Sequence, residues 1–247
     1  MNIAGTLPTL TASQMAEIDR IMLNDLGIGP LQLMELAGHA VASFAREHLL
    51  DGLPLDKRVV ILAGTGGNGG DGMVAARLLT AWGANVSLIL TRPVNDHAGV
   101  ALHQLGILQR WDISITEGTT ETPLPEADLI IDGLLGFSLD GDPHGTAATL
   151  IEAANAATAP ILAIDLPSGL NATTGKIGSP CIRATATLTL ALAKSGLGTN
   201  EAEAVTGDLW LADIGVPPAA YARIGIPLSA VLFASRPFLR LSTGPSI

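Results

Sequence analysis

The sequence predicts an α/β fold: a three-layer αβα sandwich around a mostly parallel sheet, with two N-terminal helices packed on it. From residue 58 onward, short and fully apolar runs alternate with helical patterns, as in βαβ units whose strands are covered on both faces. Hydrophobic residues make up 48% of the 247 residues and aromatic residues only 3%, so Ala, Leu, Ile and Val must form the core. Without a repeat or a Ser/Pro-rich linker, we interpret 1–247 as one domain with a core of about 11–216.

Two helices precede the first strand. Residues 11–27 show apolar residues at helical spacing, and Thr11 with Gln14 fits a capping box. A Gly-Ile-Gly break ends this helix. Pro30 then begins a second helix that runs to about Leu50, since proline is tolerated at a first helical position.

The remaining elements follow in alternation. Apolar strands are expected at residues 59–63, 85–90, 128–132, 160–165 and 185–193, and helices at 72–83, 97–108 and 146–157. After Ile214 the chain is rich in Pro and Ala and has little periodicity. We therefore expect an irregular C-terminal tail whose end is mobile.

Charge and composition exclude several function classes. The 13 basic and 23 acidic residues give a formal net charge of −10, which repels nucleic acid and anionic membrane surfaces. No run approaches the ~20 apolar residues that span a bilayer, and the first ten residues do not resemble a signal peptide. Cys181, the single cysteine, cannot form an internal disulfide and suits a reducing compartment. We expect a cytoplasmic protein.

Glycine and polar residues follow four of the expected strands, where a parallel sheet binds its ligands. These segments are 64–72, 132–137, 165–169 and 194–196. The first has six glycines in nine residues between a strand and a helix, which suits a phosphate or pyrophosphate. A tight βα turn would explain only one or two of these glycines.

The glycine segment fits neither common nucleotide motif fully. No Gly-Lys-Ser/Thr follows it, so it is not a Walker A loop. Gly64, Gly66 and Gly69 match the dinucleotide fingerprint, but the acid expected about 20 residues later is missing. Arg92 stands near that position, either to meet a 2′-phosphate or as a solvated loop arginine.

Five ordered blocks of the sequence resemble the NAD(P)H-hydrate epimerases, whose domain is Rossmann-like. They are MELAG at 34–38, GNGGDG at 67–72 with AARL at 75–78, DGLLGFSLDG at 132–141, DLPSG at 165–169 and KSGL at 194–197. The chain departs from the family pattern at three positions. Gly67 and Leu36 replace asparagines, and Ala193 replaces a proline.

The resemblance implies a repair activity. Its substrate is NADHX or NADPHX, the hydrated form of NADH or NADPH with a hydroxyl at nicotinamide C6, and the enzyme interconverts the R and S epimers. A separate NAD(P)H-hydrate dehydratase is the implied pathway partner, because the single expected domain leaves no room for one. A second copy of the chain, forming a homodimer, is a further partner hypothesis.

The resemblance also implies the site residues. One potassium ion per subunit is implied, held by Asn68, Asp132 and Ser168; their hard oxygen donors suit a hard cation. Asp165 is the candidate catalytic acid or base, since Asp132 is engaged by the ion. The implied substrate-binding residues are Gly67, Asn68, Gly69, Gly70, Asp71, Gly136, Phe137, Ser138, Leu139, Asp140, Gly141, Asp142, Asp165 and Lys194.

Each of these residues has a structural alternative. Asp132 and Asp165 could cap turns after their strands, and Ser168 could be a turn residue. Lys194 could be a solvated lysine at a strand end. Asp71 could cap a helix that begins at Gly72. Phe137 could belong to the core or to a pocket wall.

Two other function classes remain open from the sequence. An ordinary NAD(P)-dependent oxidoreductase would share the fold, although the missing ribose-binding acid argues against it. A non-catalytic nucleotide-binding or scaffold domain is the second alternative; the departures at Gly67 and Leu36 keep it open.

Overall fold

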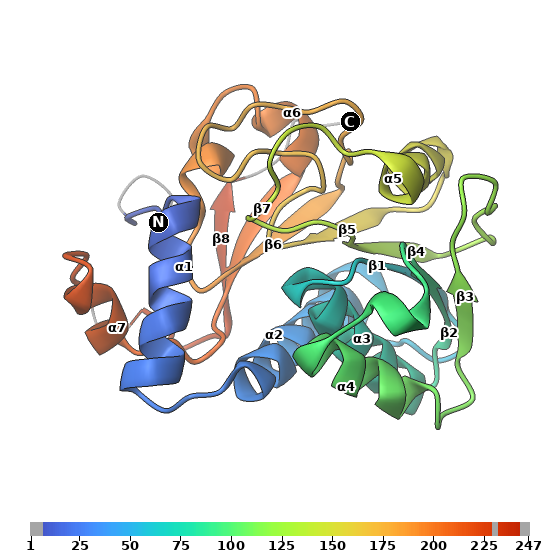
Figure 1. Ribbon diagram of the computed structural model, residues 1–247, viewed down its shortest axis with the longest axis horizontal. Helices are drawn as coiled ribbons and strands as arrows, with labels where there is room; N and C mark the ends of the chain where they lie inside the picture. The colour runs from blue at the N-terminus through green and yellow to red at the C-terminus, as the bar shows by residue number, and fades with distance from the viewer. Residues whose placement is uncertain (1–6, 229–231, 243–247) are drawn as a thin grey trace.

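An eight-stranded sheet is the middle layer of the structure, a computed structural model that describes residues 7–228 and 232–242 (Figure 1). The strand order is β3-β2-β1-β4-β5-β6-β7-β8, and every neighbouring pair is parallel except β7 with β8. The predicted α/β class and mostly parallel sheet are confirmed. The strands are β1 (Arg58–Ala63), β2 (Asn85–Leu90), β3 (Ser114–Glu117), β4 (Leu129–Gly133), β5 (Ile161–Ile164), β6 (Ala186–Leu190), β7 (Asp208–Ala212) and β8 (Phe238–Ser242).

Helices cover both faces of the sheet, with α2, α3 and α4 below it and α5 above it in Figure 1. The central strand β1 shows why both faces need cover. Val59 and Ile61 join one hydrophobic cluster with the α1–α4 side, whereas Val60 and Leu62 join a second cluster with α5. The helices are α1 (Ala12–Arg20), α2 (Pro30–Phe44), α3 (Gly67–Ala81), α4 (Gly99–Leu108), α5 (Gly145–Ala156), α6 (Glu203–Thr206) and α7 (Pro218–Arg223).

The two predicted N-terminal helices are present. The Thr11–Gln14 capping box forms, with the Gln14 amide donating to Thr11 Oγ1 at 3.2 Å and the Thr11 amide donating to Gln14 Oε1 at 2.9 Å. A π-helical turn, Ile21–Asp25, extends α1. Ahead of α1, Leu10 pairs with the segment that follows β6, because its amide donates to Ala193 O and its carbonyl accepts from the amide of Ser195.

Three strands and two α-helices of the described residues were not predicted: β3, β7, β8, α6 and α7. The expected irregular tail is wrong in part, because α7 and β8 lie in it and β8 pairs antiparallel with β7. An ion pair between Arg240 and Asp208 at 2.7 Å supports that pairing. β3 is an edge strand of four residues without a buried side chain, so it gives no apolar signal. The expected mobile end falls on residues 243–247, outside the described residues.

The last predicted strand, 185–193, is shorter than expected and ends at Leu190. Ala191 turns the chain there with φ of +64°. Among the described residues, no helix is long and apolar enough to cross a membrane.

Helix α3 begins earlier than predicted, at Gly67 rather than Gly72, so the glycine segment forms its first turns. None of the glycines in 64–72 has a positive φ. Two of them, Gly64 and Gly69, are required instead by close packing of backbone on backbone. A Cβ on Gly69 would stand 1.9 Å from Gly64 O, and one on Gly64 would stand 2.0 Å from Leu134 O.

Three alanine substitutions test this packing. Gly69→Ala should lower the free energy of unfolding by about 3 kcal/mol or more, because rigid backbone cannot make room. Gly70→Ala should cost about 1 kcal/mol, since its Cβ meets the flexible end of Met34 at 2.3 Å. Gly67→Ala is the control, with nothing within 4 Å. Urea unfolding measures all three, and equal stability of the Gly69 and Gly67 variants would contradict the packing argument.

Candidate active site

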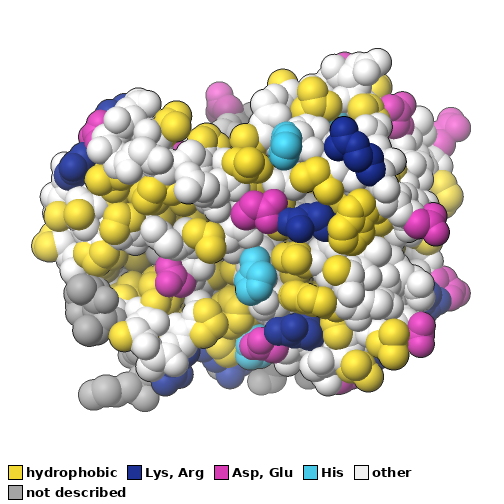
Figure 2. Space-filling model, turned by 90° about the horizontal axis from the view of Figure 1, so that it is seen from below, with side chains coloured by type: hydrophobic (Ala, Val, Ile, Leu, Met, Phe, Trp, Pro, Cys, Tyr) yellow, Lys and Arg dark blue, Asp and Glu magenta, His cyan; other side chains and the backbone are white. Residues whose placement is uncertain are grey.

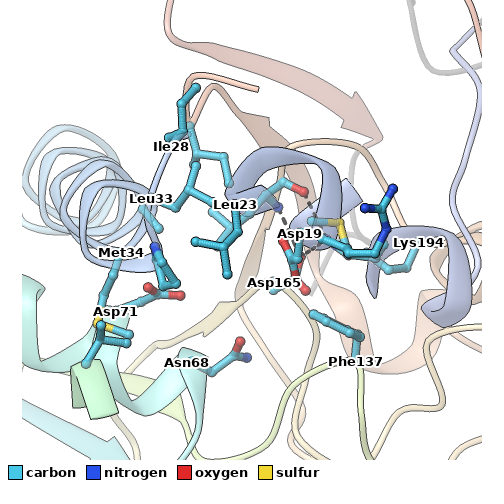
Figure 3. A pocket seen from close by; sticks show the side chains of 18 of the residues that line it. Asp19, Leu23, Ile28, Leu33, Met34, Asn68, Asp71, Phe137, Asp165 and Lys194 are labelled. Carbon is cyan, nitrogen blue, oxygen red and sulfur yellow. Dashed lines mark hydrogen bonds and ion pairs between the residues drawn. The ribbon is translucent and has the colours of Figure 1, made fainter. Parts of the chain in front are cut away.

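A pocket of about 420 Å³ lies beyond the carboxyl ends of the central strands (Figure 3). One wall is apolar and comes from the α1–α2 region, where hydrophobic side chains also gather on the face shown in Figure 2. The opposite wall comes from the start of α3 and from the segments after β5 and β6. The apolar wall includes Leu23, Ile28, Leu33 and Met34; the polar residues of the pocket include Asp19, Asn68, Asp71, Asp165 and Lys194.

A buried ion pair joins Asp165 and Lys194. Asp165 directly follows β5 and takes φ of +66°, a left-handed conformation that turns the chain where the strand ends. Its Oδ1 accepts from Lys194 Nζ, from Thr189 Oγ1 at 3.1 Å and from the Leu190 amide at 3.1 Å. Lys194 is 1% exposed and also donates to Leu190 O at 2.9 Å. It is therefore not a solvated strand-end lysine.

Asp71 faces the same pocket without a partner. It is the fifth residue of α3, so it does not cap that helix. Its side chain is 7% exposed and makes no hydrogen bond to a described residue. Burial raises the pKa of Asp71 well above its ordinary value, and the nearby carboxyls of Asp165 and Asp19 act in the same direction.

Asp19 is a pocket residue that sequence reasoning missed. Burial raises the pKa of its carboxyl to about 6, against the lowering effect of Lys194. It lies on α1 next to Ile18 and four residues after Met15, both of which are buried. An acid bordering the buried face of an amphipathic helix was the available signal.

Asn68, Asp132 and Ser168 come from three strand ends and lie together around Leu135. Ser168 Oγ donates to Asp132 Oδ1 at 2.6 Å, and the Ser168 amide donates to Asp132 Oδ2 at 2.8 Å. The Leu135 amide donates to Ser168 Oγ at 2.9 Å, while Asn68 Nδ2 donates to Leu135 O at 3.2 Å. Burial raises the pKa of Asp132 to about 6, although the hydrogen bonds from Ser168 and from the Leu134 amide lower it.

The block 136–142 is divided between two places. Phe137 lines the pocket, and Gly136 lies against the side chain of Asn68. Beyond Ser138, the next four residues line a second cavity of about 340 Å³, together with Asn171 and Lys176. Those four are Leu139, Asp140, Gly141 and Asp142.

Two further sequence hypotheses can be placed. Gly69 and Gly70 are buried in the packing of α3, whereas Gly67 lines the pocket. Arg92 is exposed and donates to Asp96 at 2.9 Å, as a solvated loop arginine does. Within the described part of the chain, no three His, Cys, Asp or Glu side chains are grouped as a metal site.

The chain is similar in sequence to proteins of one known family. A family described as YjeF-related protein N-terminus matches residues 30–196. An NAD(P)H-hydrate epimerase of Dehalogenimonas lykanthroporepellens is 38% identical over 224 residues, 88% of this chain and 86% of that protein. One of Lentilactobacillus buchneri is 40% identical over 209 residues, 84% of this chain and 94% of that protein.

Two other matches differ in kind. The bifunctional NAD(P)H-hydrate repair enzyme Nnr of Moorella thermoacetica is 37% identical over 84% of this chain, which spans only 40% of that protein. The crystal structure of the yeast protein ynu0 superposes with a TM-score of 0.79 at 25% identity, covering 95% of this chain and 100% of that one.

Removing the lysine tests the buried ion pair. Lys194→Met should lower the free energy of unfolding by about 3–5 kcal/mol at pH 8, because it leaves the carboxylate of Asp165 buried without its counterion. Adding Asp165→Asn should recover part of the stability. Lys176→Met, at an exposed lysine, is the control. If Lys194→Met lost no more stability than Lys176→Met, the pairing would be refuted.

Proposed function

The chain belongs to the family of the YjeF-related N-terminal domains and NAD(P)H-hydrate epimerases, and we propose that it interconverts the R and S epimers of NADHX and NADPHX. The family match and the epimerase relatives support this proposal. One observation in the pocket also supports it: a single cavity is lined by Asp71 and by Asp165, which is paired with Lys194. Epimerisation of a carbon that carries a hydroxyl requires acid and base groups within reach of it.

The substrate can be placed by the chemistry of the walls. We assign the hydrated nicotinamide ring to the pocket, where the apolar side chains can cover a ring and Asp165 can act as acid or base. The start of α3 and the segment 136–142 form the rest of the proposed substrate site. Its second cavity, with Lys176, can receive a more distant, anionic part of the dinucleotide.

The pathway context follows from the same proposal. A dehydratase acting on one epimer would complete the repair, and the bifunctional relatives, of which this chain spans 40% in one case, support such a partnership. The free and buried thiol of Cys181 supports a reducing compartment, for which we propose the cytoplasm.

A potassium ion fits the cluster formed by Asn68, Asp132 and Ser168. Asn68 donates through Nδ2 to Ile164 O at 2.8 Å and to Leu135 O, which leaves its Oδ1 without a donor among the described residues. A Cβ on Gly136 would stand 2.8 Å from that oxygen, so a glycine keeps the space open. Amide, hydroxyl, carbonyl and carboxylate oxygens are hard donors. When bound, the ion would supply positive charge beside the substrate phosphates and would keep Asp132 ionised.

An epimer assay tests the proposed function. The protein is incubated with the purified S epimer of NADPHX, and the R epimer is followed by chromatography with and without protein. We expect equilibration well above the uncatalysed rate, with no oxidation or reduction of intact NADPH. Redox turnover would instead support the oxidoreductase alternative, and no acceleration would support a non-catalytic domain.

The ion proposal has its own test. Potassium chloride should raise the melting temperature of the protein relative to choline chloride at equal ionic strength, since an ion that binds only the folded state stabilises it. Asp132→Asn should abolish that increase and lower the epimerisation rate together. Asp112→Asn, on an exposed acid at the other edge of the sheet, should keep both. A potassium effect that survives Asp132→Asn would contradict the assignment.

A further inference from the structure

Asp71 has no structural role that explains its carboxyl. Only 7% of this residue is exposed. It lies inside α3 beyond the first turn and makes no hydrogen bond to a described residue. A buried carboxylate without donor or counterion is strongly unfavourable. Since neither capping nor packing uses this charge, the group is available to a ligand in the pocket that it lines.

The two buried carboxyls of the pocket have opposite surroundings. Asp165 has three donors on Oδ1, one of them the Lys194 ammonium. Asp71 has none. The charged groups that face it are Asp165, Asp19 and Lys194, and burial with the two carboxyls raises the pKa of Asp71.

Arg20, which also lines the pocket, does not compensate Asp71. Its guanidinium bonds to Glu17 and Asp25 at the surface. Two carboxyls with such different surroundings, one with donors and the other with none among the described residues, are the arrangement expected of a base with its acid.

The two carboxyls also lie on different sides of the cavity. Figure 3 shows Asp71 on one side, and Asp165 with Lys194 on the other. Epimerisation at one ring carbon needs the hydroxyl to leave from one face and water to return to the other. A ring lying between these side chains would present one face to each of them.

From this geometry we infer that Asp71 is the proton donor that releases the substrate hydroxyl, with Asp165 as the base on the opposite face. The inference rests on the proposed function. The Asp71 carboxyl gives its proton to the C6 hydroxyl, the C6–O bond breaks, and water leaves. The ring nitrogen lone pair forms a C=N bond, so the ring becomes cationic and Asp71 anionic.

The second half of the reaction restores the hydroxyl. A water molecule attacks C6 from the other face and gives its proton to the Asp165 carboxylate, and the C=N electrons return to nitrogen. Asp165 then loses its proton to solvent while Asp71 regains one. In the reverse direction the two residues exchange roles, as microscopic reversibility requires. Atoms and charge balance without any redox partner.

The Asp71→Asn variant tests proton transfer without changing the size of the side chain. The amide fills the same space but cannot transfer a proton, so kcat should fall by about 10²–10⁴-fold after subtraction of the uncatalysed rate. Affinity for intact NADPH should stay within about threefold, as judged by a binding titration. In the wild type, kcat should decline toward alkaline pH as Asp71 loses its proton, and this decline should be absent from the residual activity of the variant. Asp112→Asn is the matched control and should leave kcat and its pH profile unchanged.

A second variant covers the case in which the amide disturbs folding. Asp71→Ala should be similarly slow, and added formate should restore part of its rate, more strongly at lower pH where formic acid is protonated. An Asp71→Asn enzyme within threefold of wild-type kcat, or an Asp71→Ala enzyme that formate does not restore, would overturn the role of Asp71. In both cases an active wild type would leave the proposed function standing. An inactive wild type would overturn the function itself.

Discussion

The close contact between the first turns of α3 and the sheet is the constraint on which the rest of the structure depends. Gly69 contacts the backbone of Gly64, and a Cβ on Gly133 would stand 2.8 Å from Asn68 O. Because backbone meets backbone there, α3 begins directly against the carboxyl ends of β1 and β4. That position brings Asn68 beside Ser168 and Asp132, and it directs Asp71 into the same pocket as Asp165. A side chain at either glycine would separate the cluster from the pocket.

The sequence predicted the parts of the fold that carry strong apolar periodicity. β1, β2, β4, β5 and the three crossover helices were expected, since buried parallel strands are nearly continuous apolar runs. β3 was missed because its side chains are exposed, and β8 was missed because its partner β7 lies about 30 residues earlier. No local sequence pattern predicts either strand, since the stability of each comes from pairing rather than from its own composition.

The site was predictable to a different degree. Residues at strand ends converge whenever the sheet is parallel, so Asp132, Asp165 and Ser168 could be expected to lie near one another. The contribution of α1 could not, because nothing in a helical pattern says which strand end the helix will cover. The glycine segment was predicted to bind phosphate; the structure adds a packing reason for Gly64 and Gly69, where a Cβ would meet backbone, and none of these glycines has a positive φ.

The contact of Leu10 with the segment around Lys194 has a consequence for the order of assembly. The two residues of this bridge, Leu10 and Lys194, are 184 positions apart in the chain. Helix α1, with Asp19, follows directly after Leu10. During synthesis, the segment with Leu10 and α1 is made before β6 and Lys194, so it has no docking surface until they have been made. The central strands and α3 can collapse earlier on contacts that are closer in sequence. The pocket is thus closed by a segment that is made before the strands it covers, and it is among the last features of the domain to form.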